Sequence, residues 1–284
     1  MELDTPVLDD HLHLDPANGR GIEAVEEFAR AGGTHLLVVN KPSWTLGVEV
    51  SESADFRAAF EATLDAVADA NSVLDGRAWP VFGVHPGLIS KLVDDRGHEP
   101  ETARALMEAG LAVAAEYVAD GRALALKSGR PHYDVSEGVW EASNGVLRRA
   151  LALGAEQDCA VQLHTEASED LSEVAAWAEE RGLSAERVVK HYAGGRVAGP
   201  TPSVMSEKDR LEEAAERATE SEVPFLMETD FIDDPNRPGA VLGPKTVPRR
   251  TRWLLESGFE RAVAMAHVET PERVYGIDTR ATLG

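Results

Sequence analysis

Short apolar segments rich in β-branched residues alternate along the chain with longer amphipathic segments. This alternation is typical of repeated β-α units, in which helices connect the strands of a parallel sheet. The apolar segments predict seven strands, at 7–12, 35–40, 79–84, 123–127, 160–163, 188–189 and 224–228. The amphipathic segments predict helices at 21–31, 54–71, 100–119, 136–153 and 171–181, several of which end at a glycine.

An eighth strand would fall at 197–205, but this stretch is unfavourable for a strand. It contains Gly199, Pro200 and Pro202, and proline donates no backbone hydrogen bond to a sheet. It also follows the sixth strand with no room for a helix. We therefore predict an α/β fold, a TIM-like (β/α) barrel that is irregular around its seventh strand. The 284 residues contain no linker or repeat, so we expect a single barrel domain over 1–284.

The first predicted strand carries two histidines, His11 and His13, one residue apart. Side chains of a strand alternate between its two faces, so both imidazoles point to the same side and are close enough to share a metal ion. Imidazole is a preferred ligand of zinc and similar transition metals. By itself the motif is a weak signal, because two histidines in a surface turn would look the same.

More polar residues follow the later strands where each is predicted to end. They are His85, Lys127, Arg130, His132, His164, His191 and Asp230. In a barrel, the C-terminal ends of the strands open onto one face, where active sites lie. Each residue also has an ordinary structural explanation, but histidines and an aspartate repeated at strand ends predict a metal site.

Taken in order, these segments resemble the TatD-type metal-dependent hydrolases of the amidohydrolase superfamily. The similar segments are 10–13, 83–86, 129–133, the strand that ends at His164, 191–195, 227–230 and 269–276. The resemblance implies a barrel with one or two divalent metal ions, with zinc expected first and manganese or magnesium as alternatives. It also implies that His11, His13 and Asp230 hold the first metal, and that His164 and His191 hold the second.

Lys127 departs from the family pattern, because members usually carry a metal-bridging glutamate after the fourth strand. An ammonium group there would repel the metals. In one interpretation, carbon dioxide carboxylates Lys127 and the resulting carbamate bridges the two metals, as in other branches of the superfamily. Nearby cations would favour the neutral amine that reacts. In the other interpretation the bridge is lost, and the site holds one metal or none.

We expect catalysis by a metal-activated water, with Asp230 as general base and His85 or Arg130 stabilising charge on the reacting oxygen. Many relatives carry a phosphate-binding arginine two residues after the strand-five histidine, and this chain has Glu166 there. Other candidate phosphate contacts are Lys190, Arg196, Arg249 and Arg250. The carboxylates expected to orient ligand histidines are Asp9 or Asp10, and Glu228.

Acidic residues strongly outnumber basic ones, 50 against 28, which gives a formal net charge of −22. Such a charge destabilises a compact chain unless salt screens it, so we interpret it as halophilic adaptation to a high-salt cytoplasm. The single cysteine, Cys159, agrees with a reducing cytoplasm. The sequence shows no signal peptide or membrane span, and it indicates no obligate protein partner.

Three functions remain open. The family resemblance favours a deoxyribonuclease or other phosphodiesterase acting on single-stranded DNA, for which we expect a shallow mouth lined by arginines. Lys127 and the acidic composition favour a small-molecule amidohydrolase or esterase, with a closed pocket that 196–205 would cover. A non-enzymatic metal-binding protein is the third candidate, favoured only if Lys127 leaves the site empty.

Overall fold

The computed structural model describes residues 4–237, 239 and 241–283. Its strands form one sheet in the order β8-β7-β6-β5-β4-β3-β2-β1-β9, and each pairing is parallel. The strands are β1 (Leu8–His13), β2 (His35–Val39), β3 (Ala78–Gly83), β4 (Ala125–Gly129), β5 (Val161–His164), β6 (Val188–Ala193), β7 (Thr201–Met205), β8 (Leu226–Glu228) and β9 (Phe231–Ile232). The predicted α/β fold is confirmed, and the seven predicted strands are present.

Two short strands close the sheet, because β8 and β9 are the two halves of one interrupted last strand. The first half pairs with β7, and the second half pairs with β1, where Phe231 lies opposite Leu12. Asp230 lies between the halves with a positive φ of 48°, and its N–H donates to the carbonyl of His11 at 2.9 Å. The chain thus turns from one neighbour to the other at Asp230.

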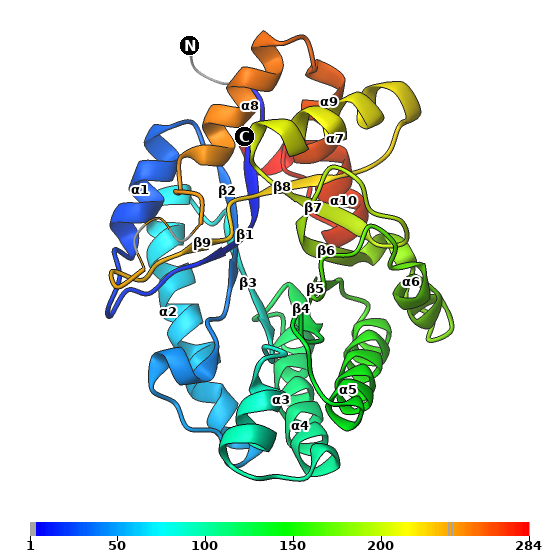
Figure 1. The fold of residues 1–284 in the computed structure, drawn as a ribbon. Helices are drawn as coiled ribbons and strands as arrows, with labels where there is room; N and C mark the ends of the chain where they lie inside the picture. Colours follow the sequence, from blue (N-terminus) through cyan, green and yellow to red (C-terminus); the bar gives the residue numbers. More distant parts are fainter. Residues whose placement is uncertain (1–3, 238, 240, 284) are drawn as a thin grey trace.

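Helices surround the strands (Figure 1). They are α1 (Ile22–Arg30), α2 (Phe56–Leu74), α3 (Leu88–Ser90), α4 (Pro100–Ala119), α5 (Glu137–Glu156), α6 (Ser172–Glu179), α7 (Lys208–Ser221), α8 (Thr246–Glu256), α9 (Glu260–Ala264) and α10 (Thr270–Tyr275). The predicted helix at 100–119 agrees with α4 at both ends. Four helices were not predicted from the sequence pattern, namely α3, α7, α8 and α9.

The region around β7 corrects one expectation. Residues 201–205 form a buried strand that pairs with β6 and β8, although 197–205 is unfavourable for a strand. Gly199, with a φ of +100°, and Pro200 precede the strand, so only Pro202 lies inside it. No helix separates β6 from β7, and their register shifts between Lys190 and Ala193, which is the predicted irregularity. Because 201–205 is part of the barrel, it is not a lid over the site.

Apolar side chains of the strands pack outward against the helices. Phe82 of β3 stacks on Phe60 of α2 with ring centroids 4.8 Å apart, and the ring edge of Tyr117 from α4 meets Phe82 at 5.3 Å. β1 differs, because Asp10 and His11 are buried with 0% exposure although both are polar. Burial of polar side chains costs free energy unless they have polar partners, so the buried polar residues of β1 indicate a candidate functional site inside the barrel.

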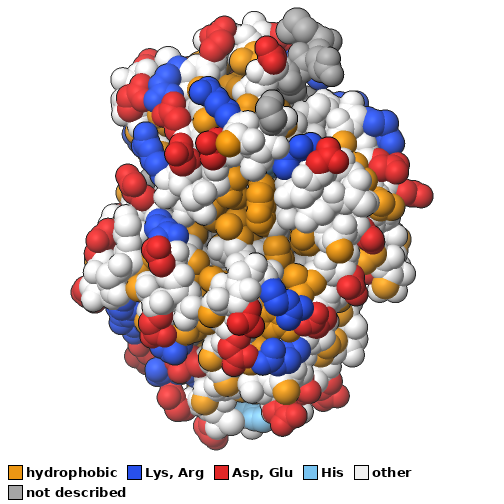
Figure 2. Space-filling view, turned by 180° about the vertical axis from the view of Figure 1, so that it is seen from behind, with side chains coloured by type: hydrophobic (Ala, Val, Ile, Leu, Met, Phe, Trp, Pro, Cys, Tyr) orange, Lys and Arg blue, Asp and Glu red, His pale blue; other side chains and the backbone are white. Residues whose placement is uncertain are grey.

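Acidic side chains are spread over the face shown in Figure 2, with fewer lysines and arginines among them. On this face the acidic side chains are therefore not gathered in one patch. None of the described helices is long and apolar enough to cross a membrane.

Candidate metal centre

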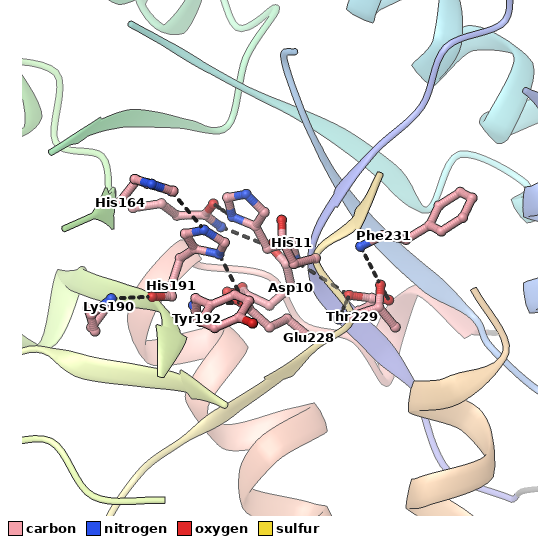
Figure 3. Close-up of polar contacts among 12 residues, drawn as sticks. Asp10, His11, His164, Lys190, His191, Tyr192, Glu228, Thr229 and Phe231 are labelled. Atoms are coloured by element: carbon pink, nitrogen blue, oxygen red, sulfur yellow. Dashed lines mark hydrogen bonds and ion pairs between the residues drawn. The ribbon is translucent and has the colours of Figure 1, made fainter. Parts of the chain in front are cut away.

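Histidines from β1, β5 and β6 lie close together in the barrel (Figure 3). His11 and His191 stack with ring centroids 3.8 Å apart. The ring of His164, the last residue of β5, lies 5.3 Å from that of His191. His13 meets His11 edge-on at 5.2 Å, as expected for alternate residues of one strand. Lys127, predicted at a strand end, lies within β4 with its Nζ 3.1 Å from His11 Nε2.

The Nδ1 atoms of three histidines point away from the cluster toward hydrogen-bond acceptors. His11 Nδ1 donates to Gln162 Oε1 at 2.7 Å, and His13 Nδ1 donates to the carbonyl of Val39 at 2.8 Å. His191 Nδ1 donates to Glu228 Oε1 at 2.9 Å. A protonated Nδ1 leaves the Nε2 lone pair free to bind a metal, and this outer hydrogen bond is the usual arrangement around ligand histidines.

Asp230 brings a carboxylate to the same point. Its Oδ1 lies 3.8 Å from His13 Nε2. One ligand atom each from His11, His191 and Asp230 lies within 4.8 Å of the other two. Two neutral imidazoles and a carboxylate suit zinc and related divalent ions, so these donors fit a metal centre.

Burial determines the charge states in this cluster. Burial is the largest cause of the lowered pKa values of five histidines, and neighbouring positive groups lower these values further. The five are His11, His13, His85, His164 and His191. Burial also raises the pKa of Asp230 to about 6, although Lys127 opposes this, and lowers the pKa of Lys127 to about 8. The imidazoles are therefore neutral near pH 7, which is the form that binds metals.

Two buried carboxylates, Glu228 beside Asp230 in the sequence and Asp9 on β1, have separate tasks. Glu228 orients His191, as predicted, and Oε1 also accepts the N–H of Tyr192 at 2.8 Å. Asp9 does not contact a histidine ring. It accepts the N–H of Thr229 at 3.0 Å and the Thr229 hydroxyl at 2.7 Å. Asp9 therefore positions the backbone next to Asp230, and it does not orient a ligand histidine.

Gln162 orients His11, and the sequence analysis missed it. Its Nε2 donates to the carbonyl of Asp10 and to the Tyr275 hydroxyl, both at 2.9 Å, which fixes Oε1 toward His11. Gln162 lies two positions before His164 in β5, so strand alternation places both on the inner face. That spacing is the signal that would have identified it.

His85 lies at the rim of the cluster, with its ring 4.6 Å from that of His164 and 5.4 Å from that of Trp44. Its Nδ1 accepts the N–H of Gly87 at 3.0 Å. The proton of the neutral ring is therefore on Nε2, which makes His85 a hydrogen-bond donor at the site. This state agrees with the expected stabilisation of a reacting oxygen.

Arg130 is held away from the cluster by its own partners. Its guanidinium pairs with Glu166 and donates to Asn144 Oδ1 at 3.0 Å. It also lies 4.6 Å from the ring centroid of Trp140, and Arg130 is only 5% exposed. These contacts do not support the expected role of Arg130 at the reacting oxygen. Glu166 neutralises the charge of Arg130 instead.

A cavity of about 360 Å³ opens beside the histidines, bounded by residues of β5, β6 and the last strand. Its lining residues are His132, His164, Thr165, Ala167, Lys190, His191, Tyr192 and Asp230. Of the residues predicted to contact a phosphate, only Lys190 is among the described residues that line this cavity. The mouth is therefore not the arginine-lined surface expected for a nuclease.

The model of the family described as TatD related DNase matches residues 8–276. The chain belongs to this TatD family. Membership makes the protein a metal-dependent hydrolase, and the His/Asp cluster is a candidate site for the metal. An uncharacterized protein of Methanocaldococcus jannaschii is 35% identical to this TatD-family chain over 283 residues, covering 96% of each.

Solved structures confirm that this TatD-family protein has the fold of amidohydrolase barrels. A lactonase from Listeria monocytogenes has a TM-score of 0.62 at 12% identity, with 95% of this chain and 94% of that chain covered. An organophosphorus hydrolase from Deinococcus radiodurans has a TM-score of 0.61 at 13% identity, with 96% and 92% covered. At this identity the similarity supports the fold alone.

Proposed function

We propose that this hydrolase cleaves ester or amide bonds of small molecules at a two-metal centre bridged by a carboxylated Lys127. The observation that carries the proposal is the place of the Lys127 amine, which is 2% exposed and lies 3.1 Å from His11 Nε2. A protonated amine cannot bind a metal and repels one, and a neutral amine offers a single lone pair, whereas a carbamate offers two anionic oxygens.

The surroundings of Lys127 favour that conversion. Burial lowers its pKa to about 8, so a sizeable fraction of the amine is neutral near neutral pH. The Nζ lone pair forms a bond with the carbon of CO₂, one C–O π bond opens, and one N–H proton leaves to water. The product is a carbamate, whose two anionic oxygens would be available to hold divalent ions.

The family resemblance assigns the donors to two ions, although a ligand atom of His191 also lies within 4.8 Å of ligand atoms of His11 and Asp230. His11, His13 and Asp230 would hold one ion, and His164 and His191 would hold the other. Nitrogen ligands make zinc the first metal to test, with manganese and magnesium after it. A bound divalent ion supplies Lewis acidity and lowers the pKa of water.

The side chains at the rim would act on the substrate. Asp230 accepts a proton from the attacking water, since its carboxylate borders both the ligand cluster and the cavity. His85 donates its Nε2 proton in a hydrogen bond to the oxygen that gains charge. The cavity volume of about 360 Å³ supports a small substrate.

A deoxyribonuclease remains the second candidate, because the family description names that activity. Single-stranded nucleic acid usually needs a basic groove along several nucleotides. The pairing of Arg130 with Glu166 removes one of the few cations near the mouth. We therefore rank phosphodiesters behind esters and amides.

The deciding experiment compares metal-loaded wild-type protein with His11→Ala on esters, lactones, amides and single-stranded DNA. We expect metal-dependent cleavage of an ester or amide that His11→Ala abolishes. Cleavage of DNA alone would contradict the proposal in favour of the nuclease. ¹³C NMR after incubation with ¹³C-bicarbonate should show a carbamate signal that Lys127→Ala loses, while Lys127→Glu should keep metal binding without the signal.

We also propose that the protein works in a high-salt cytoplasm. The net charge of −22 supports the salt adaptation, and the single cysteine agrees with a reducing compartment. The acidic surface argues against broad attraction to nucleic acid.

A further inference from the structure

Lys190 is a buried cation in the wall of the cavity. It precedes His191 in β6, is 3% exposed and lines the space that His164 and Asp230 also line. A lysine is rarely buried to this extent without a partner of opposite charge. Its surroundings therefore indicate what the cavity is built to bind.

Backbone carbonyls alone hold the ammonium group. Lys190 Nζ donates to the carbonyl of His191 at 2.7 Å (Figure 3). It also donates to the carbonyl of Thr165 at 3.3 Å. Within the described ranges of the chain, no carboxylate oxygen lies within 4.0 Å of Nζ. An ammonium group has three N–H donors, so one donor and the full charge remain available to a ligand.

Two other basic residues that were predicted to contact a phosphate have partners of their own. Arg130 is paired with Glu166, and Arg250 Nε donates to the carbonyl of Ser206 at 3.1 Å. Lys190 is thus the one basic side chain among the described residues that line this cavity. One cation in a cavity of about 360 Å³ fits one anionic group, whereas a nucleic-acid strand would need a series of cations.

Tyr192 supplies an apolar surface on the same wall. Its side chain is 45% exposed, although most large apolar side chains of the protein are buried. Its backbone has a positive φ of 56°, and its N–H is bonded to Glu228, so the residue is held in this unusual conformation. The cavity therefore combines a cation, an aromatic face and the candidate metal ligands.

We propose that Lys190 binds the anionic group, a carboxylate or a phosphate, of a small ester or amide substrate. The ammonium group would fix that end while the scissile bond lies beside His164, His191 and Asp230. This inference rests on the proposed function, because it names the class of substrate for the same site.

Matched substrates test the proposal at constant ionic strength. 4-Nitrophenyl hemisuccinate carries a carboxylate, 4-nitrophenyl butyrate has an acyl chain of the same carbon count without charge, and a 3-phosphonopropionyl ester carries a phosphonate. Wild-type protein should prefer one of the charged esters over butyrate by about 10-fold in kcat/KM, mainly through KM. The preferred anion distinguishes a carboxylate from a phosphate ligand.

Lys190→Met should lower kcat/KM for the preferred anionic ester about 10-fold more than for butyrate, and Lys190→Arg should restore part of the preference. Lys208→Met, which removes the same charge at an exposed position of α7, should not change the preference. Equal losses of both substrates in Lys190→Met would show a structural role and overturn the proposal. Absence of any preference in wild-type protein would also overturn it.

A binding measurement separates failure of this inference from failure of the proposed function. If metal-loaded protein hydrolyses no ester, the proposed function fails, and calorimetry with succinate and inorganic phosphate still tests Lys190. Binding of either anion that Lys190→Met weakens about 10-fold would support the site. No binding to wild-type protein would overturn it.

Discussion

The carboxylate of Asp9 binds Thr229 with both of its oxygens, although the two residues are 220 positions apart. Oδ1 accepts the backbone N–H at 3.0 Å, and Oδ2 accepts the hydroxyl at 2.7 Å. Thr229 directly precedes Asp230, where the last strand changes its neighbour. This pair therefore joins the first strand to the interruption that points Asp230 inward.

Replacement of the Thr229 hydroxyl should destabilise the barrel. Thr229→Val keeps the shape but leaves Asp9 Oδ2 buried without its donor, and we expect a loss of about 1–3 kcal/mol in the free energy of unfolding. Urea denaturation measures the loss, and Thr229→Ser serves as the control that keeps the hydroxyl. Equal stability of the valine variant and wild type would contradict the assignment.

Removal of the Gln162 amide should weaken metal binding. Gln162→Met deletes the acceptor that orients His11, and loss of such an outer contact typically reduces metal affinity about 10–100-fold. Competition against a chromophoric chelator measures this change. Gln162→Glu keeps an acceptor oxygen but loses the donation of Nε2 to the carbonyl of Asp10, so we expect a smaller loss than in Gln162→Met. A loss of equal size in both variants would contradict the importance of the acceptor.

Acid should destabilise the protein through His267, whose hydrogen-bond partners, Leu8 and Thr251, are not among the candidate metal ligands. Its Nδ1 accepts the N–H of Leu8 at 3.1 Å, its Nε2 donates to the Thr251 hydroxyl at 2.8 Å, and burial lowers its pKa to about 3. The unfolded chain takes up a proton near pH 6.5, whereas the folded chain does not. Stability is therefore present above pH 6.5 and falls as the pH decreases toward 3.

The size of this effect follows from the same linkage. Between pH 7 and pH 5, His267 should remove about 2 kcal/mol from the free energy of unfolding. Urea titrations at the two pH values on wild type and His267→Gln isolate that share, because the other titrating groups are common to both. An identical pH dependence in the two proteins would refute the prediction.

Salt should stabilise the fold, because the net charge of −22 produces self-repulsion that ions screen. We expect the Tm to rise when KCl increases from about 0.1 M to 1 M, over which the Debye length falls from about 10 Å to 3 Å. Differential scanning calorimetry in KCl measures the shift, with sucrose as an uncharged control. A constant or decreasing Tm in KCl would contradict the salt adaptation.

The pair formed by Arg130 and Glu166 should show energetic coupling. Each single change, Arg130→Met or Glu166→Met, leaves one charge without its partner at a largely buried place. The double variant should be more stable than the sum of the single losses predicts, by about 1 kcal/mol or more. Additive losses would show that the contact is not stabilising and would reopen a role for Arg130 at the substrate.

Much of the cluster could be predicted because its residues obey strand alternation. His11 and His13 share a face of β1, and the histidines of β5 and β6 lie at or near predicted strand ends. The sequence could not show the partners of these rings. Gln162 is an ordinary strand residue until the fold brings it 2.7 Å from His11, and Asp9 bonds to a residue 220 positions later.

Two expectations differed because long-range contacts outweighed local preferences. Pro202 is accepted in β7 because the strand is buried between β6 and β8, and tertiary packing overrides intrinsic β-propensity. Arg130 was expected to meet substrate by its place after β4. The sequence could not indicate that Glu166 and Trp140 would form a pocket for its guanidinium.

The interruption at Asp230 also places a candidate metal ligand from the C-terminal part of the chain beside His11 from the N-terminal part. His11 is on the first strand and Asp230 follows β8, so an ion held by both would act as a removable cross-link between N-terminal and C-terminal portions. A cross-link of this kind restricts the unfolded chain in the way that a disulfide with a very long loop does. The free metal concentration would then set how long the barrel persists before it opens, so that a cofactor needed for catalysis also controls the lifetime of the protein.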